Sequence, residues 1–110
     1  MHSAGVVHRD LKPSNIFLNS TNDIKIGDLG HAKLLTDDTP KNYGHINEYI
    51  ATRWYRPPEV LQGKAGDPKA VDMWAVGCIL AEMVKRRPLW TGRDDKHQTE
   101  LILATIGPSF

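Results

Sequence analysis

The chain has 110 residues, a formal net charge of +1 and a single cysteine. This length allows one domain with a modest core. A hydrophobic share of 40% and a charged share of 25% exclude a disordered or fibrous chain, and the near-neutral balance gives no reason to expect a nucleic-acid partner. Because the one thiol, Cys78, lies in an apolar run, we expect neither a disulfide framework nor a zinc cluster.

Nothing in the sequence predicts a membrane partner. No run approaches the roughly 20 apolar residues of a membrane span. Residues 1–7 lack the basic and apolar regions of a signal peptide. With a lone thiol that fits a reducing compartment, we expect the protein in the cytosol or nucleus, or both.

The first part of the chain predicts a loop and then a β-hairpin. Residues 8–15 follow the short apolar pair at 6–7 and contain Pro13, which cannot occupy a helix interior, so they are predicted as loop. Residues 16–18 and 24–26 predict short strands. The Asn, Ser, Thr and Asp residues between them are typical of a turn, which gives a hairpin.

The later part predicts helices. Residues 27–58 show little periodicity and predict a long loop. Residues 69–86 predict a helix that Asp67-Pro68 starts and Pro88 ends; its apolar side chains occupy nearly every face, so we expect it to be buried.

A last amphipathic helix is predicted over residues 97–106, closed by Gly107-Pro108. With two or three short strands followed by helices, the fold class is predicted as α+β and mostly helical, with a short hairpin beside the polar loop.

The polar loop carries the most specific motif. His8-Arg9-Asp10-Leu11-Lys12-Pro13-Ser14-Asn15 has the form H-R-D-L-x-x-x-N, which is the pattern of a protein-kinase catalytic loop. Phosphoryl transfer needs positioning and charge stabilisation. Asp10 would accept the proton of a substrate hydroxyl, Lys12 would place a cation near the phosphate, and Asn15 would offer Mg²⁺ a neutral oxygen. The triplet alone would be better explained as a surface salt-bridge cluster; the full eight-residue pattern favours the kinase loop.

Three further segments fit the same chemistry. Asp28-Leu29-Gly30 follows the second strand, where kinases carry D-F-G, and Asp28 would be the second Mg²⁺ ligand; elsewhere this triplet would be a plain turn. Residues 52–59 resemble the segment that closes the kinase activation loop, with Pro57-Pro58-Glu59 in place of A-P-E. Asp72, at the head of a buried helix, needs hydrogen-bond donors. In kinases the matching Asp accepts them from the catalytic-loop backbone; the alternative is an ordinary helix-terminus charge.

Together these segments resemble protein kinases over nearly the whole chain. Residues 48–56 and the tail at 97–103 resemble MAP kinases most, including their atypical branch. The resemblance implies ATP and Mg²⁺ as cofactors, protein substrates with Ser-Pro or Thr-Pro sites, and an upstream activating kinase. It also implies these roles: Tyr49 as phosphosite; Arg9, Arg53 and Arg56 as its phosphate partners; Thr52 as a partner of Asp10 and Lys12; His8 as a core histidine; and Glu59 as the partner of a later arginine.

The sequence also departs from the family pattern. Asn47 stands where the MAP-kinase lip has its Thr, so the dual-phosphorylation pattern is broken here. The 110 residues contain no G-x-G-x-x-G loop and no V-A-I-K lysine, which hold ATP in the family. We therefore expect residues 1–110 to be a partial kinase domain, a C-lobe fragment without the N-lobe or the last C-lobe helices, and inactive by itself.

Two alternatives stay open. The chain could be a non-catalytic binding or regulatory module of the C-lobe type. It could also belong to a cyclin-dependent-kinase-like protein, since those kinases share the closing segment, although Glu48-Tyr49 favours the MAP-kinase interpretation. The histidines other than His8 do not cluster with ligand spacing, and no functional role is predicted for them.

Overall fold

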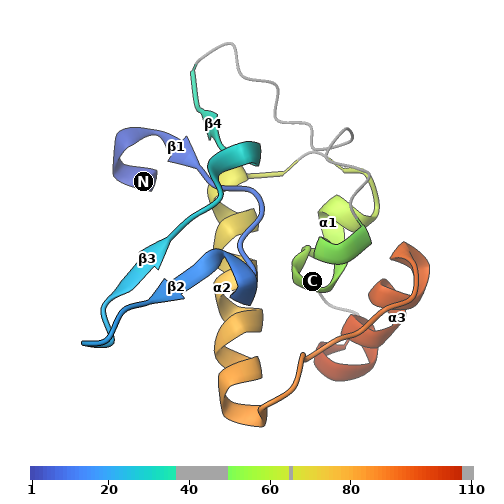
Figure 1. The fold of residues 1–110 in the computed structure, drawn as a ribbon. Helices are drawn as coiled ribbons and strands as arrows, with labels where there is room; N and C mark the ends of the chain where they lie inside the picture. Colours follow the sequence, from blue (N-terminus) through green and yellow to red (C-terminus); the bar gives the residue numbers. More distant parts are fainter. Residues whose placement is uncertain (37–49, 65, 108–110) are drawn as a thin grey trace.

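The computed structural model describes residues 1–36, 50–64 and 66–107, with side chains omitted at 50–52. Within these ranges it has four short strands and three α-helices, joined by 3-10 turns and loops. Helix α2 (Pro68–Lys85) stands in the middle of the view in Figure 1, with the strands on one side of it and the other two helices on the other. The mixed, mainly helical architecture that the sequence predicts is therefore present.

The boundaries of α2 follow from its caps. The Asp67 side chain accepts a hydrogen bond from the Lys69 N–H at 2.9 Å, and Pro68 occupies the first turn, where its missing N–H costs nothing. The helix ends at Arg86, whose φ of 61° is left-handed and whose N–H binds the Glu82 carbonyl. The predicted helix over 69–86 is thus displaced by one residue at each end.

The expectation that α2 is buried on all sides is wrong for this chain. One face holds the buried residues Val71, Asp72, Ala75, Cys78 and Ile79. The opposite face is open, with these exposed side chains: Met73, Val76, Leu80, Met83 and Val84. Apolar residues on every face show only that a helix can be covered all round; the neighbouring elements decide which faces are covered.

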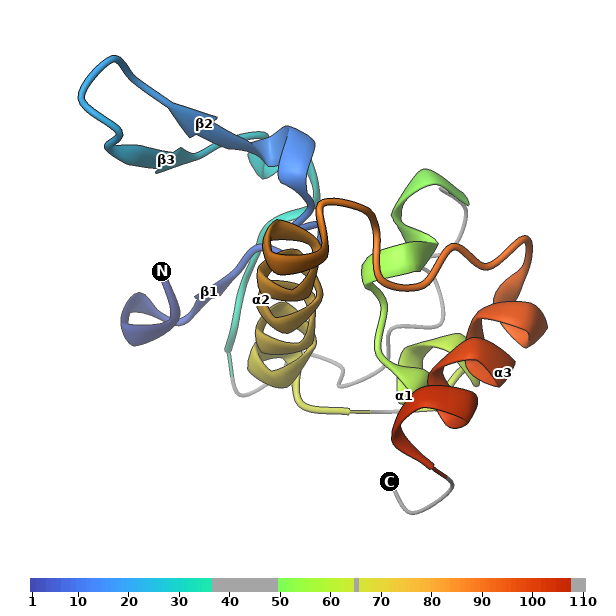
Figure 2. The ribbon, with the colours of Figure 1, turned by 90° about the horizontal axis from the view of Figure 1, so that it is seen from below.

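The strands form two antiparallel pairs. The predicted hairpin is present: β2 (Ile16–Leu18) pairs with β3 (Ile24–Ile26), with Phe17 opposite Lys25. Strand β1 (Val6–Val7) pairs with β4 (Lys33–Leu34), a strand that the aperiodic sequence of residues 27–58 did not predict. Figure 2 shows the β2–β3 hairpin projecting away from α2.

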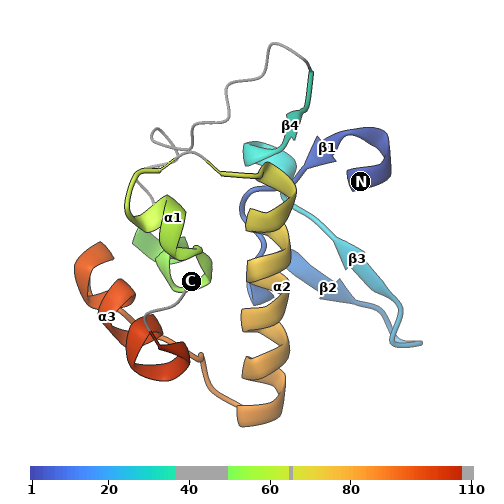
Figure 3. The same ribbon diagram turned by 180° about the vertical axis from the view of Figure 1, so that it is seen from behind.

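The remaining helices lie on the other side of α2 from the hairpin (Figures 1 and 3). A 3-10 segment, Ile50–Tyr55, leads to α1 (Pro58–Leu61), and α3 (Asp95–Ile106) packs on both. Helix α3 begins two residues before the predicted start because the Asp94 side chain accepts a hydrogen bond from the His97 N–H at 2.7 Å.

The core lies between these elements and the inner face of α2. The partly buried Trp74 stacks on the core residue Trp90, with ring centroids 5.7 Å apart. The buried members of the core come from the polar loop, the 3-10 segment, α2 and the stretch through α3: Leu11, Tyr55, Ala75, Cys78, Ile79, Trp90 and Ile102. Among the described residues, no helix is long and apolar enough to cross a membrane.

Candidate active site

The polar loop of residues 8–15 is fixed to the first turns of α2 by one carboxylate. The Asp72 side chain accepts hydrogen bonds from the backbone N–H groups of His8 and Arg9, each at 2.8 Å. Asp72 is 2% exposed, so these donors satisfy a charge that would otherwise be costly to bury. Arg9 has a φ of 71°, an unusual value for a side-chain-bearing residue, and the Asp72 bond holds it there.

Two histidines complete this support. His8 Nδ1 accepts a hydrogen bond from the Asp10 N–H at 3.1 Å, while Nε2 lies 2.8 Å from the Gly27 carbonyl. These partners assign a neutral imidazole with its proton on Nε2. His2 Nε2 lies 2.8 Å from Asp72 Oδ2. The sequence predicted no role for His2, and only the fold brings it to a residue 70 positions away.

One carboxylate oxygen of Asp10 has no hydrogen-bond partner among the residues that the structure describes. The residue is 8% exposed, and Oδ1 is buried without a hydrogen bond to any described residue. Oδ2 lies 3.8 Å from Lys12 Nζ. The Asn15 side chain donates to the Asp10 carbonyl at 2.8 Å, which ties the two ends of the loop together. A buried acceptor without a donor is unusual in a folded protein and is suited to receive a proton from a substrate hydroxyl.

Asp28 is brought beside the loop through its neighbour. The Gly27 N–H donates to the Asn15 carbonyl at 2.9 Å, so Asp28 follows directly after a residue bonded to Asn15. A Cβ at Gly27 would lie 2.3 Å from the Phe17 ring, so a side chain at this position would require that half-exposed ring to move. Asp28 has a left-handed φ of 52° and is exposed, and its Oδ1 accepts from the Gly30 N–H at 3.3 Å.

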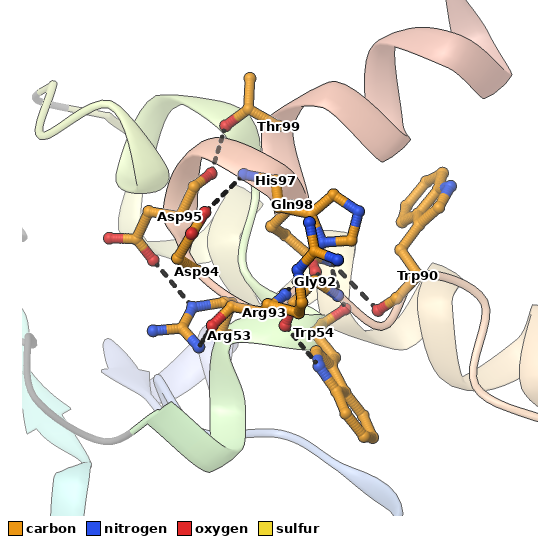
Figure 4. Close-up of polar contacts among 10 residues, drawn as sticks. All are labelled: Arg53, Trp54, Trp90, Gly92, Arg93, Asp94, Asp95, His97, Gln98 and Thr99. Carbon is orange, nitrogen blue, oxygen red and sulfur yellow. Dashed lines mark hydrogen bonds and ion pairs between the residues drawn. The ribbon is translucent and has the colours of Figure 1, made fainter.

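The closing segment is held by the loop before α3 and by the helix itself. Arg53 Nε donates to Asp95 Oδ1 at 3.1 Å and Nη1 donates to the Arg93 carbonyl at 3.1 Å (Figure 4). The Trp54 indole N–H donates to the Gly92 carbonyl at 3.1 Å. These bonds join parts of the chain that are about forty residues apart in sequence, so they set the position of the segment against α3.

Some predicted site residues lie outside the described part or have other partners. Tyr49 lies outside the described residues, as does Asn47, and the Thr52 side chain is not described. Arg9 Nε donates to the His31 carbonyl at 2.6 Å, a backbone contact rather than a phosphate. Glu59 lies in α1 and is half-buried.

The sequence of residues 1–108 matches the protein kinase domain family. The chain belongs to the protein kinase family. Its loop, hairpin and α2 are therefore those of a kinase domain, and the family generally uses ATP and Mg²⁺.

The relatives of this kinase chain include MAP kinases. It is 52% identical to the mitogen-activated protein kinase mpk-1 of Caenorhabditis elegans, over 97% of this chain and 24% of the relative. The same identity and share of this chain hold for the mitogen-activated protein kinase spk1 of Schizosaccharomyces pombe, of which 28% is covered. They hold as well for the extracellular signal-regulated kinase 1 of Candida albicans, of which 26% is covered. The chain thus spans about a quarter of the length of these relatives.

Two of the residues present, Asn15 and Asp28, are of the donor type that Mg²⁺ uses. The described residues contain no group of three or more His, Cys, Asp or Glu side chains that could hold a metal. Mg²⁺, however, takes one or two protein oxygens and completes its shell with water and phosphate. The Asn15 amide and the Asp28 carboxylate, linked through Gly27, are hard oxygen donors of that kind.

The Gln98 side chain connects three parts of this kinase domain, a role that the sequence did not predict. This side chain is fully buried; Oε1 accepts from the Gly92 N–H at 2.7 Å, and Nε2 lies 3.4 Å from the carbonyls of Trp54 and Trp90 (Figure 4). One amide therefore joins α3, the loop before it and the closing segment. A single Gln in an amphipathic helix gave no signal of this, because its partners come from distant positions.

A second missed contact joins the closing segment to α2. The Tyr55 hydroxyl donates to Glu82 Oε1 at 2.6 Å. Burial raises the Tyr55 pKa well above its ordinary value, and the Glu82 hydrogen bond and charge raise it further. In the same cluster, burial and Glu82 raise the pKa of the Cys78 thiol to about 12, so Cys78 is an inert core residue.

Proposed function

We propose that this chain is the catalytic-loop portion, of C-lobe type, of a MAP kinase-like protein serine/threonine kinase. The whole protein would transfer the γ-phosphate of ATP to Ser or Thr hydroxyls followed by Pro. The observation that carries the proposal is the buried Asp10 oxygen that has no hydrogen-bond partner in the described part of the chain, in a loop held by Asp72. The MAP-kinase relatives support the class and favour it over a cyclin-dependent-kinase-like protein.

Each loop residue has a role in this proposal. Asp10 Oδ1 receives the proton of the substrate hydroxyl and orients its oxygen for attack. Lys12, close to Asp10, supplies a positive charge for the phosphoryl group in transit. Asn15 and Asp28 would hold Mg²⁺, which when bound neutralises phosphate charge. His8 and Asp72 position this loop through its backbone.

The regulatory part of the proposal concerns the closing segment. We propose that an upstream kinase phosphorylates Tyr49 and that Arg53 and Arg56, with Arg9, pair with the phosphate. Thr52 is proposed to bond the catalytic pair, and Glu59 to meet an arginine from a later helix. Protein substrates and the activating kinase are the proposed partners, and the cytosol or nucleus is the proposed location.

A segment exchange tests the catalytic proposal. The part of mpk-1 that matches this chain is replaced by residues 1–107, and the chimera is assayed with Mg-ATP and Ser-Pro and Thr-Pro peptides. Phosphorylation that is reduced at least about 100-fold by Asp10→Asn is expected, because the general base is lost. The 110-residue chain alone, assayed alongside, is expected to be inactive.

The other outcomes decide against parts of the proposal. A well-folded chimera without activity would contradict the catalytic assignment. Activity of the 110 residues alone would show that the ATP-holding motifs are dispensable. A binding module is the second candidate, favoured by the exposed apolar side chains of α2 such as Met83 and Val84. It would be supported by an inactive chimera that still binds MAP-kinase substrates.

A further inference from the structure

The Arg53 side chain already has an anionic partner within the chain. Its side chain is 12% exposed, and its guanidinium donates through Nε to Asp95 Oδ1 and through Nη1 to the Arg93 carbonyl. Asp95 is 52% exposed and lies at the start of α3, beside the capping residue Asp94. Figure 4 shows the carboxylate at the outer side of this network, pointing at Arg53. A mostly buried cation is therefore neutralised by a carboxylate that stays in contact with water.

Arg56 belongs to the same electrostatic cluster. Burial lowers the pKa of its guanidinium, Asp95 and Asp10 raise it, and the positive charge of Arg53 lowers it. The Asp95 carboxylate therefore acts on both guanidiniums, as the direct partner of Arg53 and as a nearby charge for Arg56. A phosphate dianion, with about twice the charge of a carboxylate, is attracted more strongly to these two guanidiniums than a single carboxylate is.

We propose that Asp95 is the resident counter-ion of a phosphoryl-binding site formed by Arg53 and Arg56, and that a phosphate monoester must displace it to bind. The inference rests on the proposed pairing of these arginines with phosphotyrosine. It adds Asp95 as the residue that competes with the phosphate and weakens its binding. Asp95 acts through Arg53 and is a regulatory residue, not a catalytic one.

The exchange is physically reasonable. Among the described residues, Arg53 is the hydrogen-bond partner of the Asp95 carboxylate, and the side chain can rotate into water at little cost because it is half exposed. A phosphate monoester carries close to two negative charges and matches the guanidinium fork. The carboxylate charge repels the incoming phosphate for as long as it stays in place.

Phenyl phosphate, which resembles the phosphotyrosine side chain, is the probe. Its dissociation constant is measured by following the Arg53 Nε–H signal by NMR in the unmodified chain and in Asp95→Asn. Removing the charge should tighten binding about two- to fivefold, the range of an exposed ion pair. Glu100→Gln, which removes an equal charge from the exposed part of the same helix, should leave the constant unchanged, and Asp95→Glu should behave like the unmodified chain.

Each outcome bears on a different proposal. If Arg56→Gln, followed on the Arg53 Nε–H signal, and Arg53→Gln, followed on the Arg56 Nε–H signal, bind phenyl phosphate as well as the unmodified chain, the phosphate pairing itself is wrong. If they bind weakly but Asp95→Asn binds no more tightly, or more weakly, only the role of Asp95 is overturned. Circular dichroism checks that each variant is folded. Should Asp95→Asn not fold, the carboxyl ¹³C signal of Asp95 in the unmodified chain decides, because displacement moves it toward that of a free aspartate.

Discussion

Helix α2 has two faces of similar composition and different environment. The inner face carries Asp72, which holds the backbone of the polar loop, and Ile79, which lies in the core. The outer face carries apolar residues such as Leu80 and Val84, which are 60% and 77% exposed. A helix can therefore be equally apolar all round and still support the polar loop through residues of one face only.

The largest effect is expected from removing Asp72, the residue through which the inner face of α2 holds the polar loop. Asp72→Ala leaves the His8 and Arg9 N–H groups and the His2 ring without their acceptor. Because unsatisfied buried donors are costly, the free energy of unfolding should fall by roughly 3–5 kcal/mol. Urea unfolding followed by circular dichroism measures this. Asp72→Asn, which keeps one acceptor oxygen, should lose less, and equal losses would contradict the hydrogen-bond explanation.

A matched pair of neighbours tests the apolar part of the comparison. Ile79 is 8% exposed and its neighbour Leu80 is 60% exposed, and both side chains have four carbons. Ile79→Ala should lower the free energy of unfolding by about 2–5 kcal/mol through the cavity it leaves. Leu80→Ala should change it by no more than about 0.5 kcal/mol. Similar losses in thermal and urea melts would mean that the outer face is covered in solution.

The Tyr55–Glu82 hydrogen bond tests a second polar contact of α2, near the end of the helix. Tyr55→Phe removes the hydroxyl and leaves Glu82 without this donor, at a cost of about 1–2 kcal/mol in urea unfolding. Because the folded state raises the Tyr55 pKa, the bond stabilises below the unfolded pKa of about 10 and is lost as pH rises through the folded pKa. The loss should therefore be the same at every pH from about 6 to 9; a loss that varied there would place another titrating group at this bond.

The smallest effect concerns a helix start away from α2. The His97 N–H lowers the pKa of the Asp94 carboxyl below its ordinary value of 3.8. A depressed folded pKa gives stability that is present above the unfolded pKa and is lost as pH falls through the folded one. The melting-temperature difference between the unmodified chain and Asp94→Asn should be constant above about pH 5 and shrink below pH 3.8. If the melting-temperature difference grew as the pH fell, the folded state would raise the Asp94 pKa rather than lower it.

The sequence by itself determined the local features. The eight residues from His8 to Asn15 predicted the phosphoryl-transfer chemistry of a kinase, because that pattern of residue types and spacings is specific. The turn residues between 18 and 24 determined the hairpin, and Asp67-Pro68 determined where α2 begins, because caps and turns depend on neighbouring residues.

Contacts between residues that are distant in the sequence depend on the tertiary structure. Asp72 contacts the loop 63 and 64 residues away, and Arg53 contacts Asp95 42 residues away. Gln98 looked like any polar residue of an amphipathic helix until packing placed it under the closing segment. Periodicity gives the face on which a side chain lies, but its partner and its burial depend on the element that packs there. For that reason the sequence predicted the motif, and the fold decided how it is held.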